Sequence, residues 1–337
     1  MSLSANAPLI EVENLGVRLN TSRGPAQAVR GVSFALKRGE TLGLVGESGC
    51  GKSVTALALM GLLPESAVIS GSIRLDGREL VGLPDANYCR LRGNRISMIF
   101  QEPMTALNPM HTIGHQVAEP LRRHTSCSAA EARKEAIALL DRVGLPDAAR
   151  RVDAYPHQFS GGQRQRVTIA MALACQPDVL IADEPTTALD VTIQGQILDL
   201  IANLVAERGM AMILISHDLG VIAENVQRMM VMYGGTVVES GATDAVFTRM
   251  GHPYTQGLFR ARPRLGARKG ARLTTIAGTV PELADLPAGC TFAGRCAIVE
   301  DRCRAALPAA VNVGTGHGVR CLRTDVSMAE TVGVSGA

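Results

Sequence analysis

A glycine-rich segment early in the chain carries the residue types that bind phosphate groups. It consists of Gly46, Glu47, Ser48, Gly49, Cys50, Gly51, Lys52 and Ser53. We expect it to join a strand over residues 41–45 to a helix over residues 52–62, so that backbone N–H groups and a helix N-terminus surround an anion. Lys52 is then placed to bind the β- and γ-phosphates, and the Ser53 hydroxyl to bind Mg²⁺. The segment predicts an ATP site, although a chance glycine-rich turn is the simpler alternative.

Two carboxylates follow an apolar strand later in the chain. The strand is expected over residues 179–182 and ends at Asp183 and Glu184. Asp183 is placed to hold the Mg²⁺ shell, and Glu184 is the candidate general base toward an attacking water. An acidic pair at a strand end is weak evidence by itself. Together with a complete phosphate loop upstream, it predicts that the nucleotide is hydrolysed.

A second glycine-rich segment precedes another expected helix. It consists of Ser160, Gly161, Gly162 and Gln163. A serine followed three positions later by glutamine is a capping-box pattern, so the segment can be read as a well-capped structural helix. The exposed N–H groups of a helix N-terminus also form a receptor for a γ-phosphate, and the two interpretations are compatible.

These segments, in this order, resemble the ATP-binding subunit of an ABC transporter. The resemblance implies roles for three further residues. Gln101 matches the glutamine that contacts Mg²⁺ and water and reports to the membrane subunit. Asp190 is the last residue of Ala188-Leu189-Asp190, which matches the D-loop of the family. His217 matches the histidine that contacts the γ-phosphate. The resemblance also implies that Ser160 to Gln163 completes the ATP site of a second subunit across a head-to-tail dimer.

The order of expected elements predicts an α/β fold of the phosphate-loop ATPase type. It comprises a parallel core, an antiparallel β subdomain and an inserted helical subdomain at about residues 104–175. We expect the ATP-binding domain over residues 8–250, a small cysteine-rich C-terminal extension over residues 251–323, and a tail over residues 324–337. Strands are expected at residues 10–19, 28–36, 72–75, 96–100 and 210–215, and helices at residues 129–143 and 191–208.

The C-terminal region narrows the resemblance. His252, Pro253, Tyr254 and Thr255 are followed by Cys290, Cys296, Cys303 and Cys321. This pattern resembles the oligopeptide/dipeptide subfamily of importer ATPases. Members with matching cysteines hold a [4Fe-4S] cluster, so the resemblance implies one here. The irregular spacing differs from the paired C-x₂-C of zinc ribbons, but zinc or metal-free thiols remain alternatives.

Composition limits the remaining classes of function. Lys and Arg number 34 against 31 Asp and Glu, a balance that gives no argument for nucleic-acid binding. The longest apolar runs, residues 54–63 and 229–233, are too short to span a bilayer, and the N-terminus lacks the pattern of a secretion signal. We therefore expect a cytoplasmic chain whose membrane role comes through a partner, and the resemblance implies a peripheral position at the cytoplasmic face of the inner membrane.

The resemblance implies the partners of such a protein. They are two transmembrane permease subunits, a second ABC ATPase subunit that is favoured to be a paralogue, and, indirectly, an extracytoplasmic solute-binding protein. We expect import of oligopeptides or dipeptides. Nickel or another small solute is the alternative, followed by a non-transport ATPase of DNA repair or chromosome organisation.

One feature departs from the family pattern. The family stacks adenine on an aromatic residue near the end of the first strand, where this chain has Leu19. We expect adenine to pack on Leu19 or Val29 instead, which predicts relaxed discrimination between ATP and GTP.

Overall fold

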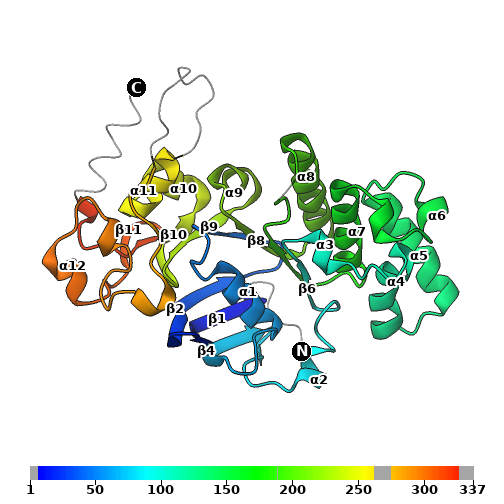
Figure 1. Cartoon of the computed structure of the whole chain (residues 1–337), viewed down its shortest axis with the longest axis horizontal. Helices are drawn as coiled ribbons and strands as arrows, with labels where there is room; N and C mark the ends of the chain where they lie inside the picture. Colours follow the sequence, from blue (N-terminus) through cyan, green and yellow to red (C-terminus); the bar gives the residue numbers. More distant parts are fainter. Residues whose placement is uncertain (1–6, 188, 262–274, 326–337) are drawn as a thin grey trace.

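The computed structural model describes residues 7–187, 189–261 and 275–325. Ala188 and nearly all of the expected tail lie outside this part of the chain. The described residues form two sheets with helices packed around them (Figure 1). Within them, no helix combines the length and apolar character that a bilayer span requires.

The smaller sheet is the antiparallel subdomain expected from the sequence. In the described residues it has four strands in the order β2-β1-β4-β5. The hairpin turn is tighter than predicted, because pairing continues to Thr21 and Gly24. The strands are β1 (Ile10–Thr21), β2 (Gly24–Leu36), β4 (Val68–Leu75) and β5 (Arg78–Glu79).

The larger sheet positions the predicted site. Its central strands β9, β3, β8, β7 and β6 are parallel, so their carboxyl ends lie at one edge. The phosphate loop follows β3, Gln101 follows β6, the two carboxylates end β7, and His217 follows β8. In order across the sheet, the strands are β11 (Val311–Gly314), β12 (His317–Val319), β10 (Thr236–Ala242), β9 (Arg228–Tyr233), β3 (Thr41–Val45), β8 (Ala211–Ser216), β7 (Val179–Asp183) and β6 (Ile96–Ile99).

Helices between β6 and β7 gather on one side of the molecule, as expected for the helical subdomain (Figure 1). Helix α7 begins with the predicted capping box of Ser160 and Gln163, and α5 begins with a second one, Ser128 with Glu131, that was not predicted. These helices are α3 (Pro103–Ala106), α4 (Ile113–His124), α5 (Ala129–Arg142), α6 (Ala148–Arg151), the 3₁₀ helix η1 (Pro156–Gln158) and α7 (Gly161–Leu173).

The other helices connect strands or form the C-terminal region. Helix α8 buries Ile197, Ile201 and Leu204 on one face, as its periodicity predicts. The helices outside the helical subdomain are α1 (Lys52–Met60), α2 (Asp85–Tyr88), α8 (Val191–Arg208), α9 (Leu219–Asn225), α10 (Thr243–Thr248), α11 (Pro253–Arg260), η2 (Leu283–Asp285), η3 (Ala293–Arg295) and α12 (Asp301–Ala305).

The C-terminal segment contributes strands to the larger sheet, which the sequence analysis did not predict. Strand β12 pairs with β10, and β11 pairs with β12. Glu239 on β10 is 1% exposed. Its carboxylate accepts hydrogen bonds from the backbone N–H groups of Gly251 (2.6 Å) and His252 (2.9 Å) and lies 2.8 Å from Nε2 of His317. This buried cluster fastens the C-terminal chain to the sheet.

Candidate nucleotide site and cysteine cavity

The phosphate loop adopts the conformation that its glycines allow. Gly46 has φ of 154° and Gly51 has φ of 96°. A Cβ atom on Gly46 would lie 2.3 Å from the Met232 carbonyl oxygen, and one on Gly51 would lie 2.7 Å from that of Ala28. Neither position therefore has room for a side chain. Lys52 is 5% exposed, and its ammonium group donates to the carbonyl oxygens of Gly46 (2.7 Å) and Glu47 (3.0 Å).

Two of the three residues predicted to hold Mg²⁺, Ser53 and Asp183, are in contact. The Ser53 hydroxyl donates to Oδ1 of Asp183 at 3.1 Å, so the loop and the end of β7 converge as expected. Asp183 is 4% exposed, and this burial raises the pKa of its carboxyl. A divalent cation at this point would offset the cost of keeping the carboxylate charged. Hydroxyl and carboxylate oxygens are the ligand types that Mg²⁺ prefers.

Glu184 is the point at which three strand ends meet. Its Oε2 accepts hydrogen bonds from Nε2 of Gln101 (3.1 Å) and Oγ1 of Thr187 (3.0 Å), and it lies 3.2 Å from Nδ1 of His217. The residue has φ of 45°, a conformation that non-glycine residues seldom adopt and that often marks a functional position. The three residues predicted to act in hydrolysis are therefore in contact. Thr187 was not predicted.

The Ser160 segment is separate from this group. Ser160 accepts a hydrogen bond from the Gln163 N–H at 3.4 Å, and Gln163 Oε1 accepts one from the Ser160 N–H at 3.3 Å. In Figure 1, α7 lies among the helices at the right and α1 at the centre. Asp190 caps α8 by accepting from the Ile193 N–H at 3.0 Å. A Cβ atom on Gly162 would lie 2.9 Å from the Ile193 side chain, so the starts of α7 and α8 are close.

Similarity to known proteins agrees with this geometry. A dimeric ATP-binding cassette in a post-hydrolysis state, bound to ADP and phosphate, matches with a TM-score of 0.63 and 28% identity, covering 69% of this chain and 98% of that one. The family model described as ABC transporter matches residues 29–187. A putative peptide import ATP-binding protein of Brucella abortus is 52% identical over 328 residues, which covers 94% of this chain and 97% of the relative. The chain belongs to the ABC transporter family of ATP-binding proteins.

The cassette is accordingly an ATPase with the α/β fold of this family. A second family model, described as the C-terminal region of oligopeptide/dipeptide transporters, matches residues 238–303. The dipeptide transport ATP-binding protein DppD of Bacillus subtilis is 50% identical over 319 residues, covering 94% of this chain and 95% of that relative. The similarity thus extends through the C-terminal segment.

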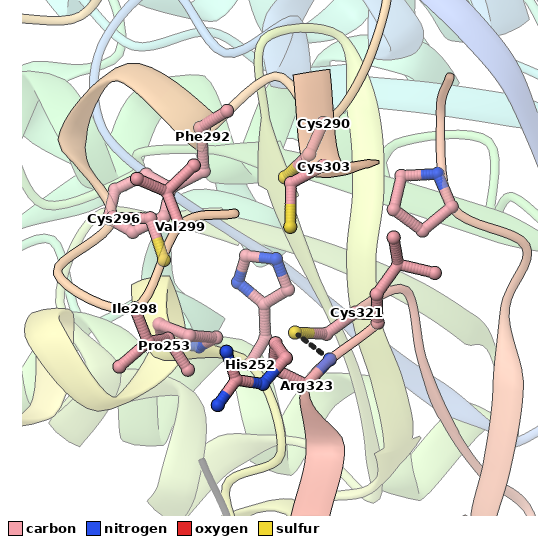
Figure 2. Close-up of a pocket in the computed structure, with 13 residues that line it drawn as sticks. His252, Pro253, Cys290, Phe292, Cys296, Ile298, Val299, Cys303, Cys321 and Arg323 are labelled. Atoms are coloured by element: carbon pink, nitrogen blue, oxygen red, sulfur yellow. Dashed lines mark hydrogen bonds between the residues drawn. The ribbon is translucent and has the colours of Figure 1, made fainter. Parts of the chain in front are cut away.

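A small cavity in the C-terminal region brings the predicted cysteines together. Figure 2 shows the sulfur atoms of all four around this cavity, with the ring of His252. Burial raises the pKa of the Cys290 thiol to about 11 and also raises that of Cys321. His252 is 1% exposed, and burial lowers its pKa to about 4, so the ring is neutral. The cavity is lined by Cys290, Cys296, Cys303 and Cys321 with His252, Pro253, Phe292 and further apolar side chains.

The expectation of a metal at these cysteines is not supported by the side-chain positions. Within the described residues, no group of three or more His, Cys, Asp or Glu side chains converges as a single metal ion requires. The cavity holds about 20 Å³, which is room for about one water molecule. The four thiols surround a common space without meeting at one point, and a larger group would require their side chains to turn outward.

The two residues predicted to contact adenine differ in exposure. Val29 is fully buried in the smaller sheet (0% exposed), whereas Leu19 keeps part of its surface exposed. Of the two, Leu19 alone presents an apolar surface to a ligand.

Proposed function

We propose that the cassette is the ATP-hydrolysing subunit of a membrane importer for oligopeptides or dipeptides. The observation that carries the proposal is the match of residues 238–303 to the C-terminal region of oligopeptide/dipeptide transporters. Relatives with about half of their residues identical are named for peptide import and dipeptide transport. We assign residues 8–250 to the ATP-binding domain, about 104–175 to its helical subdomain, 251–323 to a cysteine-rich C-terminal extension and 324–337 to a tail.

We assign roles to the site residues from the family resemblance, and their contacts support these roles. Lys52 and the loop N–H groups bind the phosphates, and Ser53, Asp183 and Gln101 hold Mg²⁺. Glu184 activates the attacking water, and His217, which lies beside Glu184, binds the γ-phosphate.

The segment from Ser160 to Gln163, with Asp190, closes the ATP site of a second ATPase subunit. Ser160 and Gly161 at the capped start of α7 are exposed, which supports this assignment because the helix start is then open to a partner. ATP bound between the two subunits joins them, and hydrolysis releases them. We favour a paralogue as the second subunit.

A groove beside Gln101 suits a permease. It holds about 310 Å³ and lies between the end of β6 and the helical subdomain. Phe100, which precedes Gln101, is 39% exposed there. The lining of the groove also includes the apolar Met98 and Met171 and the charged Glu119 and Arg123. We propose a short amphipathic helix of the membrane subunit as the occupant, with apolar side chains against the two methionines and an acidic residue toward Arg123.

This arrangement implies the location and the other partners. Two permease subunits receive two ATPase subunits at the cytoplasmic face of the inner membrane, where the cassette is peripheral. An extracytoplasmic solute-binding protein delivers the peptide to the permeases and does not contact this chain.

We further propose that the thiolates of Cys290, Cys296, Cys303 and Cys321 would hold a [4Fe-4S] cluster. The proposal rests on the resemblance of the cysteine pattern, and because the space between the thiols holds about 20 Å³, a cluster would require the four side chains to turn outward. Bound iron also stabilises thiolates that burial otherwise disfavours. Anaerobically purified protein is expected to contain about four iron atoms per chain with acid-labile sulfide. Stoichiometric zinc, or protein without metal, contradicts this part of the proposal.

Solute uptake tests the function directly. The cassette is co-purified with its membrane subunits, reconstituted in vesicles with ATP inside, and offered labelled di- and oligopeptides or Ni²⁺ outside together with the solute-binding protein. Peptide accumulation that requires ATP supports the proposal. Accumulation of Ni²⁺ without peptide uptake rejects it in favour of the alternative solute.

A further inference from the structure

Two residues of the C-terminal segment hold a residue of the phosphate loop. The Tyr254 hydroxyl accepts a hydrogen bond from the backbone N–H of Glu47 at 2.7 Å. Arg295 donates from both terminal nitrogens to the Glu47 carboxylate, at 2.7 and 3.1 Å. Because Lys52 donates to the Glu47 carbonyl oxygen, the N–H, the carbonyl and the side chain of Glu47 are all fixed.

The arginine is itself rigidly placed. Its side chain is 6% exposed, against 30% for Glu47. The guanidinium also donates to the carbonyl oxygens of Ala277 (2.9 Å) and Ile276 (3.3 Å) and to the hydroxyl of Tyr233 (3.3 Å). A bidentate guanidinium–carboxylate pair whose guanidinium makes three further hydrogen bonds fixes the position of the carboxylate and also neutralises its charge.

The charge balance matters because of what the loop binds. A carboxylate beside a triphosphate repels it, and the repulsion is strong where solvent is excluded. A partly buried carboxylate that loses its arginine is also left without a partner for its charge, which favours a shift of the residue and its backbone toward solvent. Loss of the arginine is therefore expected to disturb the loop N–H groups and the orientation of Lys52.

We propose that Arg295 is a positioning residue for nucleotide binding: through Glu47 it holds the phosphate loop in its binding conformation and cancels a negative charge next to the phosphates. The ATP site of this chain then includes a contribution from the C-terminal segment, outside residues 29–187 that match the ABC transporter model. The proposal concerns nucleotide binding by the chain itself and does not depend on which solute is transported.

The test is a comparison of variants in the full chain. ATP affinity with Mg²⁺ is measured by displacement of a fluorescent nucleotide. Arg295→Met is expected to weaken ATP binding about tenfold, and Glu47→Gln added to it is expected to restore binding to within about threefold of the wild type. In hydrolysis assays the loss falls on KM, with kcat little changed, because Glu184 and His217 are not touched.

Arg23→Met is the matched control. Arg23 ion-pairs with Glu282 (3.0 Å) and Asp285 (2.6 Å) of the same C-terminal segment but does not contact the loop. It is expected to bind ATP like the wild type. The proposal is overturned if Arg295→Met keeps wild-type affinity, or if the double variant binds as weakly as the single one, since the arginine then contributes only packing.

Arg295→Lys covers the case in which the methionine variant does not fold, as judged by its thermal unfolding midpoint. It keeps the positive charge but loses the bidentate geometry, and ATP affinity is expected to fall about threefold. A lysine variant with unchanged affinity and unchanged KM for ATP also overturns the proposal.

Discussion

Oε2 of Glu184 lies 3.2 Å from Nδ1 of His217. The same oxygen is held by Gln101 and Thr187, so one end of the carboxylate is fixed from three directions. A histidine that directs Nδ1 at a carboxylate donates from that nitrogen and turns Nε2 toward the remaining side of the site. The proposed base and the proposed γ-phosphate ligand thus orient each other.

Replacement of Glu184 by glutamine tests its role as base. The amide preserves the size of the side chain but cannot accept a proton, so we expect hydrolysis to fall by about 10²-fold or more, with ATP still bound. Single-turnover hydrolysis and the amount of ATP-bound dimer on gel filtration measure the effect. Thr187→Val removes a neighbouring hydrogen bond without removing the base and is expected to cost far less. Unchanged turnover in Glu184→Gln would refute the assignment.

Ser160→Arg separates the two ATP sites. The large cation at the start of α7 is expected to block closure over the partner's ATP while this chain still binds nucleotide at its own loop. Photo-crosslinking of labelled ATP to each subunit, with the ATPase rate of the assembled pair, distinguishes the sites. Ser128→Arg makes the same change at the capping box of α5 and serves as the control. A defect confined to the chain's own site contradicts the trans arrangement.

Leu19 stands where the family has an aromatic residue that stacks on adenine, so restoring an aromatic side chain is expected to increase the preference for ATP. Leu19→Tyr is expected to raise the preference for ATP over GTP about fivefold, because a ring stacks on adenine more favourably than a leucine side chain does. Competition of the two nucleotides for one fluorescent probe measures it. Val311→Tyr, at an exposed position of β11, controls for the added aromatic. A wild-type chain that already strongly prefers ATP contradicts the expectation.

The Glu239 cluster predicts a large effect on stability. Glu239→Ala leaves two buried N–H groups and His317 without their partner, so we expect the free energy of unfolding to fall by about 3 kcal/mol. Chemical denaturation measures the change. Glu224→Ala, at an exposed position of α9, is expected to change it by less than about 0.5 kcal/mol. Equal effects of the two substitutions would show that the cluster adds no stability.

The site residues that their own chemistry predicts share one property, because each group is local in sequence, whereas Gln101 and His217 were expected only from the family resemblance. The phosphate loop and the carboxylates at the end of β7 carry their chemistry in adjacent residues, and the rule for parallel strands then brings them to one edge. The Glu47 contacts could not be predicted, because Tyr254 and Arg295 lie 207 and 248 positions away. Thr187 has no chemical signature, and β11 and β12 are too short and glycine-rich to show a strand period.

The pairing of β12 with β10 has a consequence for shortened forms of the chain. If residues beyond 310 are removed, β10 becomes the outermost strand of the larger sheet, with open backbone N–H and C=O groups along one side. Such an edge recruits strands from other molecules. Proteolytic loss of the C-terminal strands should therefore lead to self-association and precipitation while the phosphate loop is still folded.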